Sequence, residues 1–226
     1  MLWPELQQAV ATCQACKLCE GRKNAVFGAG QPPLEDRSAP QVDWLIVSDA
    51  PDEDEDRTGQ PFGGNAGDKV GGDAGKLLDN MLKAIGQARA RNVFVTNVVK
   101  CRPPGNRNPE AAELAQCAPY LARQIALVQP RVILAMGRFA IQALLQASVP
   151  DVQKLPLGKL RGQVHQYVLD TSDPSKASDA SNTIDGRSIP VIATYHPVAL
   201  LRNLPDKAKA WADLCLAMEV LAKNTE

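Results

Sequence analysis

The sequence predicts an α/β fold, a three-layer αβα sandwich around a central, mainly parallel four-stranded sheet. Four short apolar runs predict buried parallel strands, because strands covered on both faces carry apolar side chains at successive positions. Segments with the apolar spacing of helices lie between these runs. Strands that alternate with helices form a parallel sheet flanked by helices. With 226 residues, 45% of them hydrophobic, the chain can bury one sizeable core.

The expected helices and strands alternate along most of the chain. A first helix is expected over residues 4–12, with a proline in its first turn. The four expected strands are residues 44–47, 93–96, 132–135 and 191–194. Further helices are expected over residues 74–85, 108–128, 138–146 and 207–223, and a surface loop over residues 171–187. Pro119 should kink or split the helix over 108–128, since proline removes a hydrogen bond and clashes with the preceding turn.

Composition indicates a single domain over residues 1–226, whose first segment, residues 1–30, carries cysteines. The chain has 25 basic and 25 acidic residues, which counts mildly against a nucleic-acid partner because phosphate binding draws on Lys and Arg. It has no apolar run of about eighteen residues, and its start lacks the basic and apolar regions of a signal peptide. We therefore expect a cytoplasmic protein that does not enter a membrane.

Cysteine usage is a strong chemical signal. Six cysteines in a chain without an export signal favour metal or redox ligation over disulfides. Cys13 and Cys16 form a C-x2-C pair, and Cys101 and Cys117 form a second, wider pair. Four cysteines fit either a structural zinc ion or a [4Fe-4S] cluster, since both take four thiolates. The spacing alone does not decide between the two.

Polar or turn-forming residues follow the carboxyl ends of all four expected strands. They are Asp49, Asn97, Gly137 and His196, in chain order. In an open parallel sheet, ligands bind beyond the carboxyl ends of the strands. Each residue has a structural alternative: Asn97 can cap a turn, Asp49 can lie in solvent, and a single histidine is more often structural than catalytic. Their convergence at one edge of the sheet favours a functional site.

Four separated motifs carry a family resemblance. They are C-x2-C-x2-C-x2-R at residues 13–22, D-R-T-G-Q-P-F at 56–62, T-N-V-V-K-C-R-P-P at 96–104 and H-P-V-A-L-L-R at 196–202. In this order they resemble the family 4 uracil-DNA glycosylases, the iron-sulfur members of the uracil-DNA glycosylase fold. The likeness extends over residues 6–221, which is nearly the whole chain.

The resemblance implies an activity and a cofactor. The implied activity is DNA repair: uracil is flipped out of DNA and its N-glycosidic bond is hydrolysed, which leaves an abasic site. The implied cofactor is a [4Fe-4S] cluster on Cys13, Cys16, Cys101 and Cys117, with a structural role rather than a redox role in the reaction. The resemblance thus favours iron-sulfur over zinc.

The resemblance also implies residues for catalysis and base recognition. Asp49 and His196 are the implied catalytic residues, and His196 donates toward the carbonyl where negative charge gathers as the base departs. The implied substrate-binding residues are Ala50, Glu55, Phe62 and Asn97. Phe62 would stack on the flipped base, Asn97 would recognise its polar edge, and Glu55 would crowd the C5 position and exclude thymine.

DNA contacts and partners follow from the same resemblance. The implied DNA-binding residues are Arg107, Leu200, Leu201 and Arg202. Residues 198–202 resemble the segment that wedges into DNA beside the extruded nucleotide. Uracil-containing DNA is the implied partner, with repair or replication proteins as further candidates. The chain is expected to act as a monomer.

The first motif departs from the family pattern. Where the family carries Gly-Glu-x-Pro-Gly after the first strand, residues 48–52 are Ser-Asp-Ala-Pro-Asp. If the family Glu orients the attacking water, Asp49 is shorter by about 1.5 Å, and such a misplacement can cost on the order of 100-fold in rate. The carboxylate of Asp52 would repel phosphate. A tandem octapeptide, residues 63–70 and 71–78, also lengthens the loop after Phe62.

Three functions are compatible with these observations. Phe62, Asn97 and His196 favour an active uracil-DNA glycosylase. The altered first motif and the zero net charge favour a catalytically degenerate member that serves as a DNA- or protein-binding module in repair or replication. Asp49 and the lengthened loop leave room for a glycosylase that acts on a different damaged base. The acidic run over residues 52–56 is expected to be solvated rather than to bind a cation.

Overall fold

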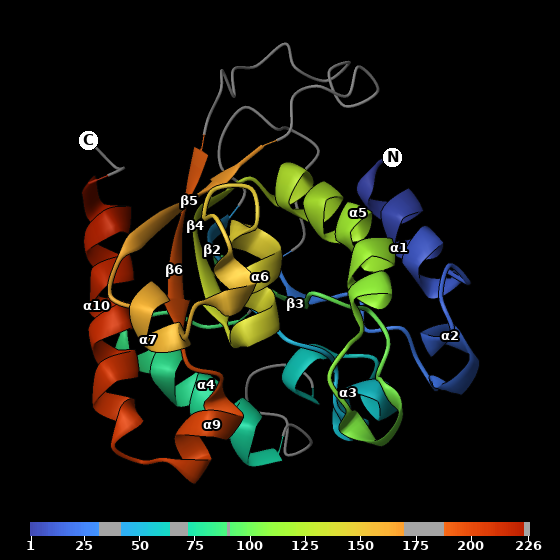
Figure 1. Ribbon diagram of the computed structural model, residues 1–226, viewed down its shortest axis with the longest axis horizontal. Coiled ribbons are helices and arrows are strands. Elements are labelled where there is room, and N and C mark those ends of the chain that lie inside the picture. Colours follow the sequence, from blue (N-terminus) through green and yellow to red (C-terminus); the bar gives the residue numbers. More distant parts are fainter. Residues whose placement is uncertain (32–41, 64–71, 90, 170–187, 224–226) are drawn as a thin grey trace.

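A six-stranded mixed sheet forms the centre of the molecule (Figure 1). The structure is a computed structural model that describes residues 1–31, 42–63, 72–89, 91–169 and 188–223. The strand order is β1-β3-β2-β4-β6-β5. Four strands are parallel: β2 (Val42–Ser48), β3 (Val93–Asn97), β4 (Pro130–Met136) and β6 (Ser188–Thr194). The edge strands β1 (Ala29–Gly30) and β5 (Val164–Val168) are antiparallel to β3 and β6.

The four predicted strands are confirmed, but the sheet is wider than predicted. Strand β1 has only two residues, and β5 alternates between exposed and half-buried positions. Neither strand carries the continuous apolar run that marks a strand buried on both faces. These two strands, which were not predicted, form the two edges of the sheet. The parallel centre is as predicted.

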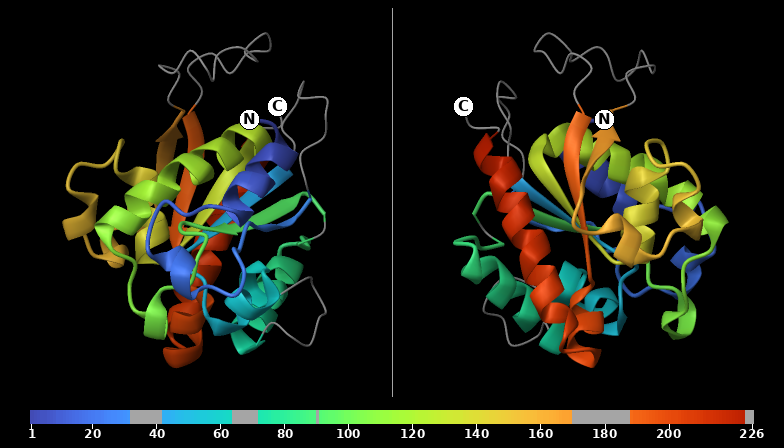
Figure 2. Two further views of the ribbon diagram at one scale, coloured as in Figure 1. Left: turned by 90° about the vertical axis from the view of Figure 1, so that its right-hand side faces the viewer. Right: turned by 60° about the vertical axis from the view of Figure 1, so that its left-hand side comes forward.

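Helices cover both faces of the sheet, which confirms the three-layer arrangement. In the right-hand view of Figure 2, the sheet lies between the helix of residues 206–223 (red) and the helix of residues 138–145 (yellow). One face carries α1 (Trp3–Ala11), α5 (Ala111–Val128), α6 (Arg138–Leu145) and α7 (Leu157–Leu160). The other face carries α4 (Gly72–Ala84) and α10 (Asp206–Lys223). The connections contain the short helices α2 (Leu18–Gly21), α3 (Glu53–Thr58) and α9 (Pro197–Arg202) and the 3-10 turns η1 (Pro61–Gly63), η2 (Pro104–Asn106) and η3 (Val152–Lys154).

The sheet separates two apolar clusters. Side chains of a strand point alternately to its two faces. Leu45 and Val47 of β2 therefore join the cluster under α5 and α6, whereas Trp44 and Ile46 join the cluster under α4 and α10. All four side chains are fully buried. This packing fixes the strand ends that carry the site. Within the described ranges, no helix combines the length and the apolar character that a membrane span needs.

Helix α5 continues through Pro119, so the prediction that this residue splits the helix is wrong, while a kink there stays a prediction. Proline removes one backbone donor, a loss that tertiary packing can offset. Leu121 and Ile125, which follow it, are buried against the sheet and hold the second half of the helix there. The predicted loop over 171–187 and residues 64–71 of the two octapeptide copies lie outside the described residues. The second octapeptide copy supplies the start of α4.

Candidate active site

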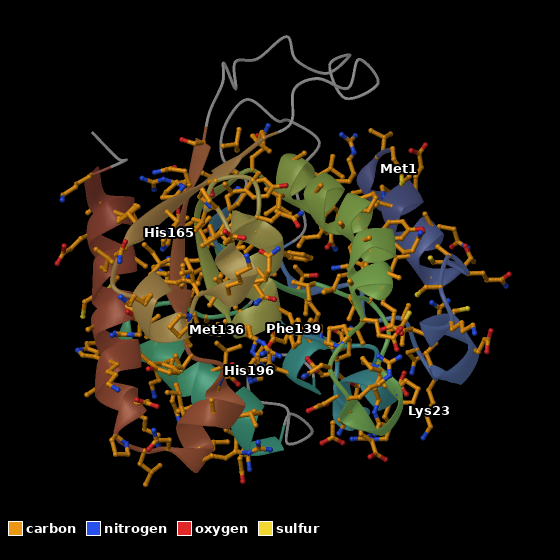
Figure 3. All side chains as sticks on the ribbon, in the orientation of Figure 1. Met1, Lys23, Met136, Phe139, His165 and His196 are labelled. Atoms are coloured by element: carbon orange, nitrogen blue, oxygen red, sulfur yellow. The ribbon has the colours of Figure 1, made fainter. Side chains whose placement is uncertain are left out.

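The carboxyl ends of the parallel strands bring the predicted catalytic and base-binding residues together. Ser48 at the end of β2 and Asn97 at the end of β3 are neighbours in register. His196 directly precedes α9, just after β6. Ala50 is half-buried, two residues beyond the end of β2. Figure 3 shows His196 at this edge of the sheet and His165, the other histidine, well away from it.

His196 has a defined tautomer and is neutral. The backbone N–H of Val198 donates to Nδ1 at 3.2 Å, so Nδ1 is an acceptor and the ring proton lies on Nε2. Burial lowers the pKa of His196 to about 4, because a low dielectric disfavours the imidazolium. The Nε2–H is 2.9 Å from Ser48 Oγ and donates to it. At neutral pH the imidazole is therefore an uncharged hydrogen-bond donor.

Asn97 presents an unpaired acceptor. Its side chain is fully buried, and its Oδ1 has no hydrogen-bond partner. Within the described ranges, Trp44 Nε1 is the other buried side-chain atom of this kind. The amide Nδ2 donates to Glu55 Oε1 across a long 3.4 Å. A buried polar atom without a partner costs about 1–3 kcal/mol. A ligand that donates a hydrogen bond to Asn97 Oδ1 would remove this cost.

The Glu55 carboxylate connects three groups of the site. Oε1 accepts from the backbone N–H of Phe62 at 2.7 Å and from Asn97 Nδ2, and Oε2 accepts from the backbone N–H of Asp52 at 2.7 Å. Glu55 is only 6% exposed. Burial raises its pKa to about 7, and the nearby Asp52 adds to the rise. In this structure the carboxylate positions its neighbours, and its exclusion of thymine stays a prediction.

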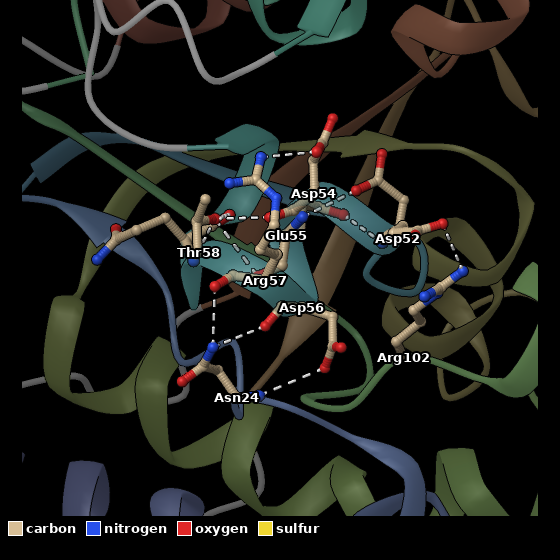
Figure 4. A network of polar contacts seen from close by, with 10 residues as sticks. Asn24, Asp52, Asp54, Glu55, Asp56, Arg57, Thr58 and Arg102 are labelled. Carbon is tan, nitrogen blue, oxygen red and sulfur yellow. Dashed lines mark hydrogen bonds and ion pairs between the residues drawn. The ribbon is translucent and has the colours of Figure 1, made fainter.

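The acidic run over residues 52–56 folds into α3 and its cap (Figure 4). Asp52 is the N-cap and accepts from the backbone N–H of Glu55 at 2.9 Å. Asp56 is 3% exposed and accepts from the backbone N–H groups of Lys23 and Asn24 at 2.9 and 3.4 Å. The prediction that this run is solvated is wrong for Glu55 and Asp56. Asp56 instead ties the cysteine segment to the helix that carries Glu55.

Phe62 lies in the site in a strained conformation. Its φ of 53° and ψ of 29° are left-handed, which costs about 1–3 kcal/mol for a bulky residue. Glu55 holds its N–H, and the buried Arg89 donates toward its carbonyl at 3.5 Å. A side chain at Gly75 would come within 2.6 Å of that carbonyl, so α4 needs glycine there. The ring stacks on His196 with centroids 5.5 Å apart. The lengthened loop has therefore not displaced Phe62 from the site.

Asp49 anchors the N-terminus of α6. Its Oδ1 accepts from the backbone N–H of Ala140 at 2.9 Å, and the N–H groups of Phe139 and Arg138 add hydrogen bonds. Burial raises the pKa of Asp49 to about 6. Gly137 has a φ of 101°, and a side chain there would lie 2.3 Å from Asp49 Oδ2. The carboxylate thus serves as a helix cap, and its action on water stays a prediction.

The predicted DNA-binding residues fall into exposed and buried positions. Leu201 and Arg202 at the end of α9 are exposed, and Leu204 just beyond them is 60% exposed. Leu200 is 1% exposed and lies on the inner face of α9, so its contact with DNA stays a prediction. Arg107 forms ion pairs with glutamates at the start of α5. Its contact with DNA stays a prediction.

The four predicted cysteine ligands line one pocket. Its wall contains Cys13, Cys16, Cys19, Cys101 and Cys117, together with Arg22, Lys100 and Tyr120. The structure thus gathers residues from two distant parts of the chain, and it places Cys19 beside them. In the described parts of the chain, no three histidine, cysteine or acidic side chains gather closely enough for a single metal ion. The five thiols are spread around the wall of the pocket rather than gathered about one point.

Two cations flank this cysteine pocket. Arg22 Nη1 donates to Cys101 Sγ at 3.0 Å. Lys100 is 2% exposed, and its ammonium donates to Thr96 Oγ1 at 2.6 Å and to the backbone carbonyl of Asn97 at 2.7 Å. Burial raises the pKa of Cys101 to about 11 and lowers that of Lys100 to about 7. Lys100 therefore connects the cysteine pocket to the strand end that carries Asn97.

Comparisons with known proteins agree with the sequence motifs. A profile of the Uracil DNA glycosylase superfamily matches residues 35–215. The chain is 35% identical over 215 residues to the type-4 uracil-DNA glycosylase of Saccharolobus solfataricus, which covers 95% of this chain and 84% of that protein. It is 35% identical over 198 residues to the type-4 uracil-DNA glycosylase of Thermotoga maritima, and the matched region covers 88% of this chain and 82% of that protein. The chain therefore belongs to the uracil DNA glycosylase superfamily and, within it, to the type-4 family.

Proposed function

We propose that this protein excises uracil from DNA by hydrolysing the N-glycosidic bond of a flipped nucleotide. The observation that carries the proposal is the buried Asn97 amide, with its unpaired Oδ1, at the same strand edge as the neutral Nε2–H of His196. The relatives named type-4 uracil-DNA glycosylases support the same reaction. The product would be free uracil and an abasic site.

Asn97 would recognise uracil by its hydrogen-bonding edge. Its Oδ1 would accept from N3–H of the base, and its Nδ2 would donate to O4. Cytosine presents an acceptor at N3 and a donor at C4, which is the reverse pattern. A site built for one pattern rejects the other strongly, because its buried groups are then left unpaired. Glu55 fixes this orientation, since it accepts from Nδ2 and would repel Oδ1.

His196 would stabilise the departing base. When the glycosidic bond breaks, negative charge gathers on the carbonyl oxygens of the base, and a preorganised donor lowers the barrier. A neutral imidazole with its proton on Nε2 is such a donor. Phe62 would stack on the base, a contact worth about 1–3 kcal/mol, against a cost of a few kcal/mol for flipping. In this structure the Phe62 ring stacks on the His196 ring, so the base would contact both rings.

Glu55→Gln should weaken discrimination between uracil and cytosine. A glutamine amide can donate to Asn97 Oδ1, which lets the Asn97 amide turn and match the cytosine edge. We expect the ratio of uracil to cytosine excision rates to fall by at least about tenfold. Burial raises the pKa of Glu55 to about 7, so in the wild type the carboxyl becomes protonated below neutral pH and can then donate to Asn97 Oδ1. We therefore expect the wild-type ratio of uracil to cytosine excision rates to fall as the pH falls below about 7.

Single-turnover rates on uracil- and cytosine-containing oligonucleotides, measured from acidic to alkaline pH, test the role of Glu55. A glutamine side chain does not titrate, so the rate ratio of the Glu55→Gln variant should not change across neutrality. Glu53→Gln is the matched control, because Glu53 lies on the exposed side of α3. An unchanged ratio in Glu55→Gln, in a variant that still folds, would show that Glu55 does not orient Asn97.

We further propose that the cysteine pocket holds a [4Fe-4S] cluster on Cys13, Cys16, Cys101 and Cys117. Such a cluster is held by four thiolates on different irons, which suits thiols spread around a pocket wall. Arg22, which donates to Cys101 Sγ, supplies positive charge that favours a thiolate there. The cluster would cross-link the N-terminal segment to the strand that ends at Asn97. Its contribution would be structural.

The DNA contact would involve the exposed end of α9. Leu201 and Leu204 are apolar and exposed, and Arg202 between them supplies a charge for phosphate. These residues follow His196 in the chain, so an inserted side chain would lie beside the base that His196 contacts. The chain's action as a monomer, and its contacts with repair or replication proteins, stay predictions.

A product assay tests the proposed function directly. Oligonucleotides with a single uracil, thymine or cytosine are incubated with the purified protein, then assayed for free base and for alkali-labile sites. We expect uracil release with matching strand breaks, and little release of thymine or cytosine. If the protein binds these oligonucleotides but releases no base, it is a binding module. The Asp49 carboxylate accepts from the backbone of α6. This capping role favours the binding module as the second candidate function, because a carboxylate engaged in this way is less available to orient water.

A further inference from the structure

Ser48 places a hydroxyl against the His196 imidazole, at a position where the family pattern carries glycine. Its Oγ lies 2.9 Å from His196 Nε2, and the residue is 1% exposed. Ser48 ends β2 and is paired in register with Asn97 on β3. Side chains at paired positions of parallel neighbours point to the same face of a sheet. The hydroxyl therefore lies on the face that carries the Asn97 amide.

The direction of the Ser48–His196 hydrogen bond follows from the other ring nitrogen. Nδ1 accepts from the backbone N–H of Val198, so the neutral ring donates through Nε2 and Ser48 Oγ accepts. A serine hydroxyl has one donor proton and two acceptor lone pairs. Accepting from His196 thus leaves the Ser48 O–H proton available for a second partner. Its rotation about the Cβ–Oγ bond can direct this proton toward a ligand.

A base carbonyl that accepts from His196 would also come within reach of Ser48. Such an oxygen lies about 3 Å from Nε2, and Ser48 Oγ already lies 2.9 Å from the same nitrogen. The oxygen cannot occupy the position of Oγ, so it must approach beside it. A hydroxyl next to a carbonyl oxygen can donate to that oxygen. The two side chains would then supply two donors to one acceptor.

We propose that Ser48 is a second hydrogen-bond donor to the departing base, acting beside His196. The proposal rests on the proposed uracil excision. The bond between C1′ and N1 of the base breaks with its electron pair passing to the base, and the charge spreads onto O2. Water supplies the hydroxyl that adds to C1′, and its proton passes to the base. The Nε2–H that Ser48 Oγ accepts in the free enzyme would then be shared with O2. Ser48 O–H and His196 Nε2–H would both stabilise the charge on O2 before that proton arrives.

The capping role of Asp49 fits this assignment. The first motif reads Ser-Asp where the family pattern reads Gly-Glu, and the Asp49 carboxylate is engaged by backbone donors of α6. A serine beside His196 supplies a polar group directly at the reacting base. Its hydrogen bond to O2 would strengthen as charge develops, so Ser48 would raise the maximal rate more than substrate affinity.

Ser48→Ala and Ser48→Gly test the proposal on two leaving groups. Single-turnover rates are measured on oligonucleotides with uracil or with 5-fluorouracil, whose fluorine makes the departing anion more stable. Loss of one such donor costs about 10²-fold in rate. We expect that loss on uracil, a clearly smaller loss on 5-fluorouracil, and an unchanged enzyme concentration for half-maximal rate. Ser48→Gly carries the family residue, so it separates loss of the hydroxyl from misfolding.

Other outcomes overturn the proposal in distinguishable ways. Equal losses on both bases would mean that Ser48 acts on structure rather than on leaving-group charge. An unchanged or faster Ser48→Ala enzyme would mean that the hydroxyl only competes for the His196 proton. A wild-type protein that releases neither base would instead refute the proposed function, and Ser48 catalysis with it.

Discussion

Asn97→Asp should lower uracil excision by about 10⁴-fold. The substitution keeps the shape of the side chain but removes its N–H donor to uracil O4. It also places a carboxylate beside Glu55, whose Oε1 now accepts from Asn97 Nδ2. Both effects act on a fully buried group, where unpaired charge is costly. Single-turnover rates on a uracil-containing oligonucleotide measure the loss.

Asn92→Asp is the matched control for Asn97→Asp. Asn92 is exposed and precedes β3 at the opposite end of the strand, so the same chemical change there should leave excision unchanged. Thermal melting of both variants separates lost recognition from lost folding. Near-normal excision by a folded Asn97→Asp enzyme would mean that Asn97 does not recognise the base.

Double substitution of Cys101 and Cys117 by serine should remove bound iron and destabilise the fold. Both cysteines are 4% exposed and line the pocket with Cys13 and Cys16 from the N-terminal segment. Loss of a structural cross-link worth several kcal/mol corresponds to a fall in Tm of about 10 °C, since each kcal/mol shifts a domain of this size by about 2–4 °C. Iron analysis, visible absorption and thermal melting measure both effects.

Two further cysteines provide controls for the cluster. Cys215→Ser changes a cysteine of α10, away from the pocket, and should leave iron content and Tm unchanged. Cys19→Ser changes a cysteine of the pocket wall that is outside the proposed ligand set, and should also retain iron. Iron retained by the Cys101, Cys117 double variant, or lost on Cys19→Ser, would contradict the proposed ligands.

The parallel centre of the sheet was predictable because burial on both faces leaves a continuous apolar run in the sequence. Strands β1 and β5 leave no such trace, because one has two residues and the other is exposed along part of its length. Pro119 is the opposite case. A local rule predicts an interruption there, but the packing of Leu121 and Ile125 against the sheet holds α5 together. Tertiary contacts of this kind cannot be inferred from local sequence.

The site was predictable where residues follow strand ends in recognisable motifs, as Asn97 and His196 do. Contacts between distant segments were not predictable. Arg89 and Lys100 are charged residues that would be assigned to the surface, yet both are buried and hold parts of the site. Leu200 and Leu201 are adjacent in the sequence, and only the orientation of α9 decides that Leu201 is the exposed one.

The most direct test compares His196→Ala with His165→Ala in the uracil-release assay. His196 is the neutral donor at the strand edge, whereas His165 lies on β5 and its Nε2 lies 2.7 Å from the backbone carbonyl of Leu160. We expect robust release by the wild type, a loss of about 10²- to 10³-fold in His196→Ala, and full activity in His165→Ala. Release that survives in a folded His196→Ala enzyme, or that is absent from the wild type, would contradict excision by this site.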